Sequence, residues 1–227
     1  MDGMRRGIVS NCWQHQLQTG GRLPSLVRQA AAAGYSVFEL RQGCLGTYEA
    51  GEDHVPDAVR LGELVRECRG FEWDLALAYP CFSPDCDGSD PLFQAGCSAI
   101  AEMADGQTPH LRLVDLQSET SGLAAATAAQ TVTRLLAMVR GVGGQLSIEH
   151  SRQEWSWFRE VFERARQLAA DDGTWLKICF DPCNLLSDAS GPDPAEVTAS
   201  LTSEEVSMIH LKPVSYTHLT LPTILLV

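Results

Sequence analysis

The chain has 227 residues, of which 44% are hydrophobic and 20% are charged, and this length suits one compact domain with a large core. Its 29 acidic and 17 basic residues give a formal net charge of −12, which argues against nucleic-acid binding because an acidic surface repels phosphates. No apolar run reaches the length of a membrane span, and no signal core follows the first residues. The eight cysteines lack the spacing of zinc sites, so we expect reduced thiols in a cytoplasmic protein.

Apolar strand-like runs alternate with helical segments along the chain. In chain order, the predicted elements are strand Arg6–Cys12, helix Leu23–Ala33, strand Ser36–Arg41, helix Pro56–Arg69, strand Trp73–Tyr79, helix Pro91–Met103, strand Leu111–Leu116, helix Leu123–Arg140, strand Gln145–His150, helix Gln153–Ala170, strand Trp175–Asp181, helix Asp193–Leu201 and strand Val206–Lys212. Gly34 suits the left-handed position that ends the first helix.

This alternation predicts parallel βαβ units and an α/β fold. Seven strands followed by an abrupt stop favour a (β/α)8 TIM barrel that is truncated after about seven strands, since a complete barrel takes about 250 residues. A doubly wound open sheet is the alternative. It is weakened because no Gly-x-Gly-x-x-Gly motif follows the first strand.

The last residues of the chain differ in character from the rest. Val214–Val227 reads VSYTHLTLPTILLV, which contains no acidic or basic residue and no helix cap. This stretch resembles one reading frame of a transposase adapter used in sequencing libraries. We therefore expect residues 1–213 to be an incomplete barrel and residues 214–227 to be an adapter-derived artefact. Such a remnant leaves the first and seventh strands unpaired, which predicts poor soluble expression.

In a (β/α) barrel the active site lies at the carboxyl ends of the strands. The last three predicted strands each carry a candidate metal ligand at this end, namely Glu149, Asp181 and His210. Two carboxylates and an imidazole suit Mn²⁺, Co²⁺, Mg²⁺ or Zn²⁺ and leave coordination positions for substrate oxygens. Three such residues in register are much less frequent by chance than one strand-end carboxylate that caps a helix.

The motifs LSIEH, ICFDPCN and MIHLK, together with the opening GIVSNCW and AAAAGYSVFELR, resemble the sugar phosphate isomerase/epimerase family of xylose isomerase-like TIM barrels. The resemblance implies a divalent metal held by Glu, Asp, His and Glu, of which Glu149, Asp181 and His210 match the first three. It also implies that Glu149 is one of two acid/base groups acting through an enediolate. The fourth ligand has no counterpart before Pro213.

Other polar residues near the strand ends are candidates for substrate binding. Asn184 stands where several epimerases carry a histidine, and Lys212 belongs to HLKP where many relatives have HLKD. Glu39 and Arg41 form an ion pair with each other in one interpretation, and in the other Arg41 holds an anionic substrate. His15 follows the first strand and is either a pocket residue or a solvated one.

The sequence therefore predicts a metal-dependent isomerase or epimerase of a small sugar, sugar phosphate or keto acid, inactive in its truncated form. A dehydratase of a cyclic polyol, similar to inosose dehydratase, is one alternative. A non-catalytic barrel or an endonuclease-like barrel is another, although the net charge argues against DNA. We expect a small-molecule substrate, no nucleic acid and no membrane partner, and homo-oligomer formation stays open.

Overall fold

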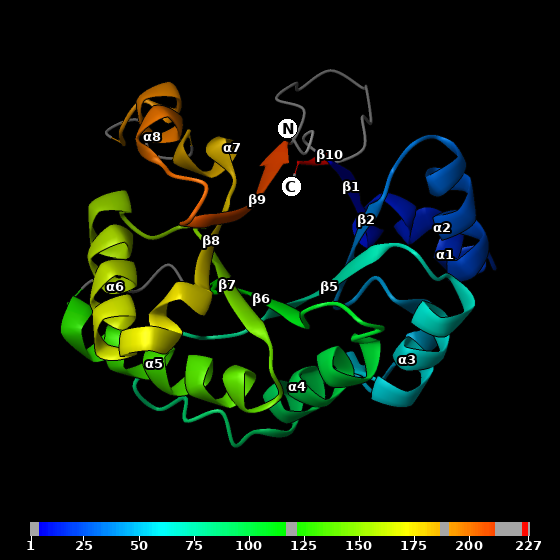
Figure 1. Ribbon diagram of the computed structural model, residues 1–227, viewed down its shortest axis with the longest axis horizontal. Helices are drawn as coiled ribbons and strands as arrows, with labels where there is room; N and C mark the ends of the chain where they lie inside the picture. Colours follow the sequence, from blue (N-terminus) through cyan, green and yellow to red (C-terminus); the bar gives the residue numbers. More distant parts are fainter. Residues whose placement is uncertain (1–4, 117–121, 187–190, 212–223, 227) are drawn as a thin grey trace.

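The computed structural model describes residues 5–116, 122–186, 191–211 and 224–226. Within these ranges, seven parallel strands form the wall of a barrel (Figure 1). They are β1 (Arg6–Val9), β2 (Val37–Arg41), β5 (Glu72–Ala78), β6 (His110–Val114), β7 (Gln145–Glu149), β8 (Leu176–Phe180) and β9 (Val206–Leu211). Each strand pairs with the next in this order, which confirms the predicted α/β barrel of about seven parallel strands.

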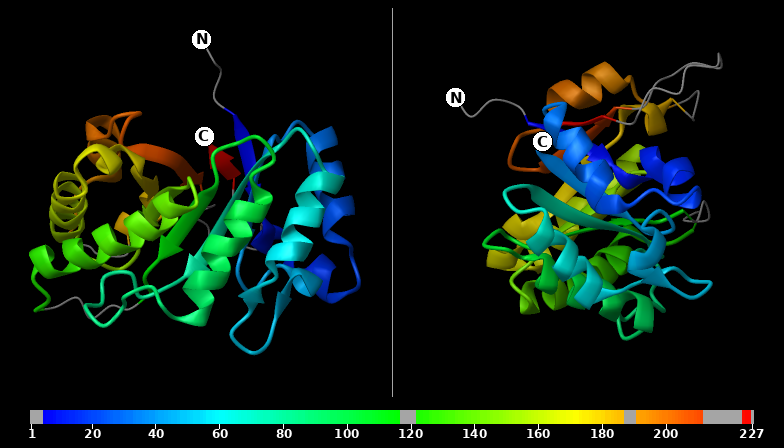
Figure 2. Two further views of the ribbon diagram at one scale, coloured as in Figure 1. Left: turned by 60° about the horizontal axis from the view of Figure 1, so that its bottom comes forward. Right: turned by 90° about the vertical axis from the view of Figure 1, so that its right-hand side faces the viewer.

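Helices cover the outside of this wall (Figure 2). The longer ones are α2 (Leu23–Ala32), α3 (Ala58–Glu67), α4 (Pro91–Met103), α5 (Ala125–Gly141), α6 (Trp155–Leu168) and α8 (Pro194–Ser200), and the shorter ones are α1 (Gln14–Gln18) and α7 (Pro182–Leu185). The carboxylates of Asp57, Asp90 and Asp193 accept a backbone N–H at the starts of α3, α4 and α8. Gly34 follows α2 with φ of 91°, as its sequence position predicts.

Short elements complete the connections between strands and helices. In the described part of the chain, three 3₁₀ segments each lead directly into the next element: η1 (Ser10–Trp13), η2 (Gly46–Tyr48) and η3 (Ala170–Trp175). After β2, a small antiparallel pair is formed by β3 (Glu49–Ala50) and β4 (Val55–Pro56). This pair lies outside the barrel and leaves the order of the parallel strands unchanged.

The edges of the parallel sheet do not stay open. A further strand, β10 (Ile224–Leu226), runs antiparallel to both β1 and β9 and closes the barrel between them. The prediction that the first and seventh strands are unpaired is therefore wrong. An open edge offers a row of backbone N–H and C=O groups that any extended segment can pair with, whatever its origin. Most of the stretch 214–227 lies outside the described residues.

The barrel has an apolar outer layer and a polar interior. Because side chains alternate across a strand, Leu111 and Leu113 of β6 are buried in the apolar core, whereas Arg112 extends to carboxylates of β2 and β7 inside the barrel. The buried polar residues include Glu39, Asp74, Arg112, Ser147, Glu149, Asp181 and His210. The interior therefore holds charged groups that only the neighbouring strands can satisfy.

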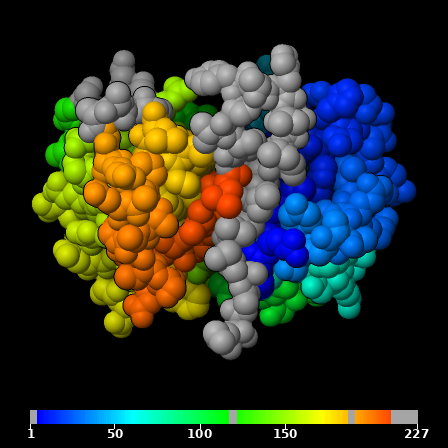
Figure 3. Space-filling view, turned by 90° about the horizontal axis from the view of Figure 1, so that it is seen from above, coloured from blue at the N-terminus to red at the C-terminus, as the bar shows by residue number. Residues whose placement is uncertain are grey.

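Figure 3 views a face of the molecule on which the C-terminal segments, in orange, lie on one side and the N-terminal segments, in blue, lie on the other. This arrangement follows from the pairing of β10 with both β1 and β9. Within the described part of the chain, every helix is too short or too polar to cross a bilayer.

Candidate metal and substrate site

A cavity of about 280 Å³ opens at the carboxyl ends of the strands. Its wall comes from β1, β2, β6, β7 and β9 and from the turns that follow them, with Asn184 of α7 added from β8's side. The residues that line it are Val9, Asn11, Glu39, Arg41, Arg112, Val114, Leu116, Glu149, Ser151, Arg152, Asn184 and His210. This is the end of the barrel at which the fold places active sites.

Four buried residues at the base of this cavity form what we call the charged cluster: Glu39, Arg112, Glu149 and His210. Arg112 donates through Nε and Nη2 to the two carboxylate oxygens of Glu39, at 3.1 and 2.6 Å. Its remaining terminal nitrogen, Nη1, donates to Oε2 of Glu149. A planar guanidinium matches two carboxylates in this way, so one cation fixes Glu residues from two separate strands.

His210 completes the charged cluster from β9. Its Nε2 lies 3.0 Å from Oε2 of Glu39, and its Nδ1 lies 3.7 Å from Oε1 of Glu149. Burial alone would lower the pKa of His210, but neighbouring Cys179 and Glu39 raise it well above its usual value. Burial alone would raise the pKa of Glu39, and the charges of Arg112 and His210 instead lower it to about 2.

Asp181 and Asn184 lie at the turn between β8 and α7. Asp181 is fully buried, and its Oδ1 accepts the backbone N–H of Cys183 at 2.9 Å, which caps α7. Asn184 donates from Nδ2 to Oε1 of Glu149 at 3.3 Å and to the carbonyl of His150 at 2.7 Å. The turn therefore places an amide next to the same Glu149 oxygen that faces His210.

Cys179 of β8 joins two of the predicted ligands. Its Sγ lies 3.5 Å from Nε2 of His210. Glu149, Cys179 and His210 each offer one donor atom, and these atoms lie within 4.8 Å of one another. Asp181 is not part of this group. A carboxylate, a thiol and an imidazole that converge at this distance fit a divalent cation, which makes the interior of the barrel chemically suited to the metal that its motifs imply.

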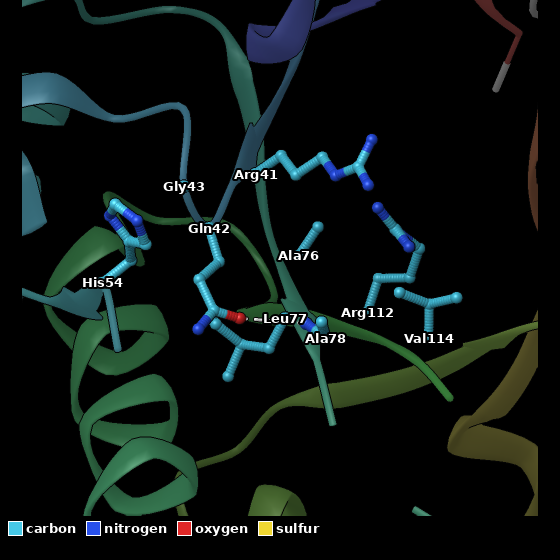
Figure 4. A pocket seen from close by; sticks show the side chains of 9 residues that line it. All are labelled: Arg41, Gln42, Gly43, His54, Ala76, Leu77, Ala78, Arg112 and Val114. Atoms are coloured by element: carbon cyan, nitrogen blue, oxygen red, sulfur yellow. Dashed lines mark hydrogen bonds between the residues drawn. The ribbon is translucent and has the colours of Figure 1, made fainter. Parts of the chain in front are cut away.

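Arg41 points into the site but does not pair with Glu39. Glu39 bonds to Arg112 and His210 instead, so the predicted Glu39–Arg41 ion pair is wrong. Arg112 reaches Glu39 from β6, with only β5 between their strands. Arg41 and Arg112 both line the mouth cavity and an adjoining cavity of about 230 Å³. Figure 4 shows the ends of these two side chains pointing toward one another.

Of the other two predicted substrate residues, the structure describes only His15. His15 is exposed on α1 and lines neither of these two cavities. Lys212 lies outside the described residues. Of the predicted site residues that the structure describes, Glu39, Arg41, Glu149, Asn184 and His210 line one cavity.

Sequence reasoning missed Arg112 and Cys179. Both lie within strands, in HLRLV and LKICF, rather than beyond the strand ends where Asp181 and Asn184 stand. A single charged residue between leucines was the available signal for Arg112, because such a residue inside a barrel strand needs a buried partner of opposite charge. For Cys179 the alternation of β8 places it on the same face as Asp181.

No family model and no curated protein matches the chain. Solved structures do match. A sugar phosphate isomerase/epimerase from Parabacteroides distasonis ATCC 8503 has a TM-score of 0.64 at 12% identity, over 96% of this chain and 80% of that one. A probable 3-DHS dehydratase involved in petrobactin synthesis, from Bacillus anthracis, has a TM-score of 0.61 at 15% identity. The match covers 93% of this chain and 74% of that one.

A third match is a fusion protein of a xylose isomerase-like TIM barrel with 4-hydroxyphenylpyruvate dioxygenase, with a TM-score of 0.61 at 15% identity. The matched region is 93% of this chain, and it spans only 32% of the fusion protein. Likeness at these identities is a likeness of fold. The chain therefore has the TIM-barrel fold of these proteins.

Proposed function

We propose that the protein is a divalent-metal-dependent isomerase or epimerase of a small sugar, sugar phosphate or keto acid. The observation that carries this proposal is the convergence of Glu149 and His210, from different strands, at the base of the mouth cavity. Solved neighbours described as a sugar phosphate isomerase/epimerase and an L-ribulose 3-epimerase support the class of activity.

In this proposal Glu149, Asp181 and His210 hold the cation, which is Mn²⁺, Co²⁺, Mg²⁺ or Zn²⁺. The cation would polarise the carbonyl and hydroxyl oxygens of the substrate and stabilise negative charge that develops on them. Glu149 removes the proton from the carbon next to the carbonyl. Arg112 and Asn184 donate to its two oxygens and so hold the carboxylate in a fixed orientation for that transfer.

Around Glu149, the remaining mouth residues position the substrate. Asn184 has amide hydrogens suited to a sugar hydroxyl, and Arg41 has a planar fork suited to a carboxylate or phosphate. We also propose substrate roles for Glu39, which orients Arg112, and for Lys212. Glu39 is the better supported of these two because both of its oxygens accept from Arg112.

Proton abstraction can be tested without knowing the final product. In D₂O with Mn²⁺ or Co²⁺, a panel of ketoses, ketose phosphates and keto acids is followed by NMR for deuterium uptake next to the carbonyl. One base suffices for this exchange, so we expect uptake into at least one compound. We expect Glu149→Gln to slow it about 100-fold or more.

The matched control for this exchange experiment is Glu196→Gln, an exposed glutamate of α8 outside the cavity. This variant should catalyse deuterium exchange into the substrate at the same rate as the unchanged protein. Equal exchange by the Glu149→Gln variant, or no exchange into any compound of the panel, would reject the proposed function.

A dehydratase is the second candidate, favoured by the likeness to the probable 3-DHS dehydratase. It would use the same proton abstraction by Glu149 but would then lose a hydroxyl group. In the same NMR experiment it is recognised by the appearance of a vinylic proton signal in place of simple deuterium exchange.

A further inference from the structure

Cys179 is a buried thiol at the centre of the barrel with no part in the proton transfer described above. It lies opposite Glu149 in the register of β7 and β8, and it is fully buried. Burial raises its pKa to about 12, so the free thiol is a poor nucleophile at neutral pH. Its position next to His210 and Glu149 needs another explanation than covalent catalysis.

The separations around Cys179 match those in a metal site. Zinc bonds of about 2.3 Å to sulfur and about 2.0 Å to nitrogen, at tetrahedral angles, place the two donors about 3.5 Å apart. The observed distance between Sγ of Cys179 and Nε2 of His210 is 3.5 Å. With Glu149 included, the three donor atoms stay within 4.8 Å of one another. Small side-chain movements would bring all three to one ion.

The charges of the surrounding groups also suit a divalent cation. Arg112 contributes one positive charge, and Glu39 and Glu149 contribute two negative charges. If Cys179 binds as a thiolate and His210 as a neutral imidazole, these groups together carry a charge of −2, and the carboxylate of Asp181, the other proposed ligand, adds one more negative charge. A divalent cation neutralises most of this charge, and it would itself deprotonate the thiol, as metal ions do for coordinating cysteines.

We propose that Cys179 is a thiolate ligand of the metal, alongside Glu149 and His210, and that it makes the site selective for Zn²⁺ or Co²⁺ over Mg²⁺ and Mn²⁺. The inference rests on the proposed metal site and adds the identity of the ion. Thiolates are soft ligands that favour zinc-like ions, whereas carboxylate, carbonyl and water ligands suit the harder ions Mg²⁺ and Mn²⁺.

Cobalt absorption tests the ligand directly. When Co²⁺ is added to the full chain, a thiolate ligand produces a sulfur-to-cobalt charge-transfer band in the near ultraviolet. We expect this band, and we expect Cys179→Ser to abolish it. The matched control is Cys97→Ser, which removes another buried thiol, on α4, and should leave the band unchanged.

Calorimetry measures the selectivity of the same variants. Cys179→Ser should weaken Zn²⁺ binding at least about tenfold, because even the partners of metal ligands contribute that much to affinity, and it should change Mn²⁺ binding far less. Equal losses for both ions would contradict the inference.

X-ray absorption of the unchanged protein with Zn²⁺ removes any dependence on the folding of the variants. A sulfur shell at about 2.3 Å supports the proposal, and a first shell of nitrogen and oxygen alone overturns it. In that second case, bound zinc with deuterium exchange intact would leave the proposed function standing. Absence of any metal binding would instead reject the metal site as a whole.

Discussion

The interior of the barrel buries polar groups in two different ways. The charged cluster of Glu39, Arg112, Glu149 and His210 lies at the mouth, where every member has a partner of opposite charge. One pleat nearer the amino ends of the strands lie Asp74, His110 and Ser147, which we call the neutral cluster. There, Nδ1 of His110 is 3.8 Å from Asp74, and Nε2 is 2.6 Å from Oγ of Ser147.

The two clusters differ in how burial is compensated. In the charged cluster, ion pairs outweigh burial, so Glu39 keeps its charge. In the neutral cluster, burial dominates: it raises the pKa of Asp74 well above its usual value, with a further contribution from Glu39, and it lowers the pKa of His110 to about 4. Of these two clusters, the one that a guanidinium reaches keeps its charge, and that is where the proposed chemistry needs it.

Removing the guanidinium of Arg112 from the charged cluster should have the largest effect on stability. Arg112→Met leaves two buried carboxylates uncompensated, and we expect the free energy of unfolding to fall by about 3–5 kcal/mol. Urea denaturation at pH 7 measures it. A loss below about 1 kcal/mol would show that the carboxylates do not depend on Arg112.

The triple variant Arg112→Met, Glu39→Gln, Glu149→Gln is the control for that loss. It removes the charges together with their partner, and it should recover most of the stability. If the triple variant is as unstable as the single one, lost packing of the long Arg112 side chain is the cause instead.

His110 should make the fold sensitive to acid. Its pKa is about 4 in the folded protein and about 6.5 when unfolded, so the unfolded chain binds more protons between these values. Stability is therefore lost as the pH falls through this window, by roughly 2–3 kcal/mol. His110→Gln keeps a partner for Ser147 without titrating, so its stability should fall less between pH 7 and pH 4. An identical pH profile would contradict the neutral state of His110.

Asp74 should change the pH dependence of stability in the direction opposite to His110, and its replacement should have a smaller net effect on stability. Because its pKa is raised, the folded protein holds a proton that the unfolded chain releases above about pH 4, so stability falls as pH rises. Asp74→Asn removes this titration but buries an amide, and we expect a net gain of about 1 kcal/mol at pH 7 and none at pH 4. A loss at pH 7 would mean that Asp74 is ionised.

The fold could be predicted from sequence because its signals are local. Apolar strand-like runs and helical periodicity define the βα units; helix α4, for example, spans Pro91–Met103 as predicted. The charged cluster could be predicted only in part, since Glu149 and His210 end their strands but Arg112 lies within one. Which carboxylate Arg112 reaches depends on the diameter and register of the closed barrel, which no local pattern encodes.

We propose that residues 214–227 are derived from an adapter and that β10 occupies a place that a native strand would take. Pairing at the edges of β1 and β9 requires only backbone groups, so it does not identify the strand as native. The genomic sequence after the codon of Pro213 tests this. We expect it to encode a helix and an eighth strand with a glutamate, and a gene that continues into VSYTHLTLPTILLV would contradict the proposal.

Above all, we propose that Glu149 and His210 bind a divalent cation at the mouth of the barrel. Anomalous diffraction from crystals soaked in Co²⁺ tests it most directly. We expect a single strong peak within bonding distance of both side chains, about 2.0–2.3 Å away, with Arg112 still donating to Glu39. Crystals that show no peak there, while Glu149 and His210 remain ordered, would contradict the account.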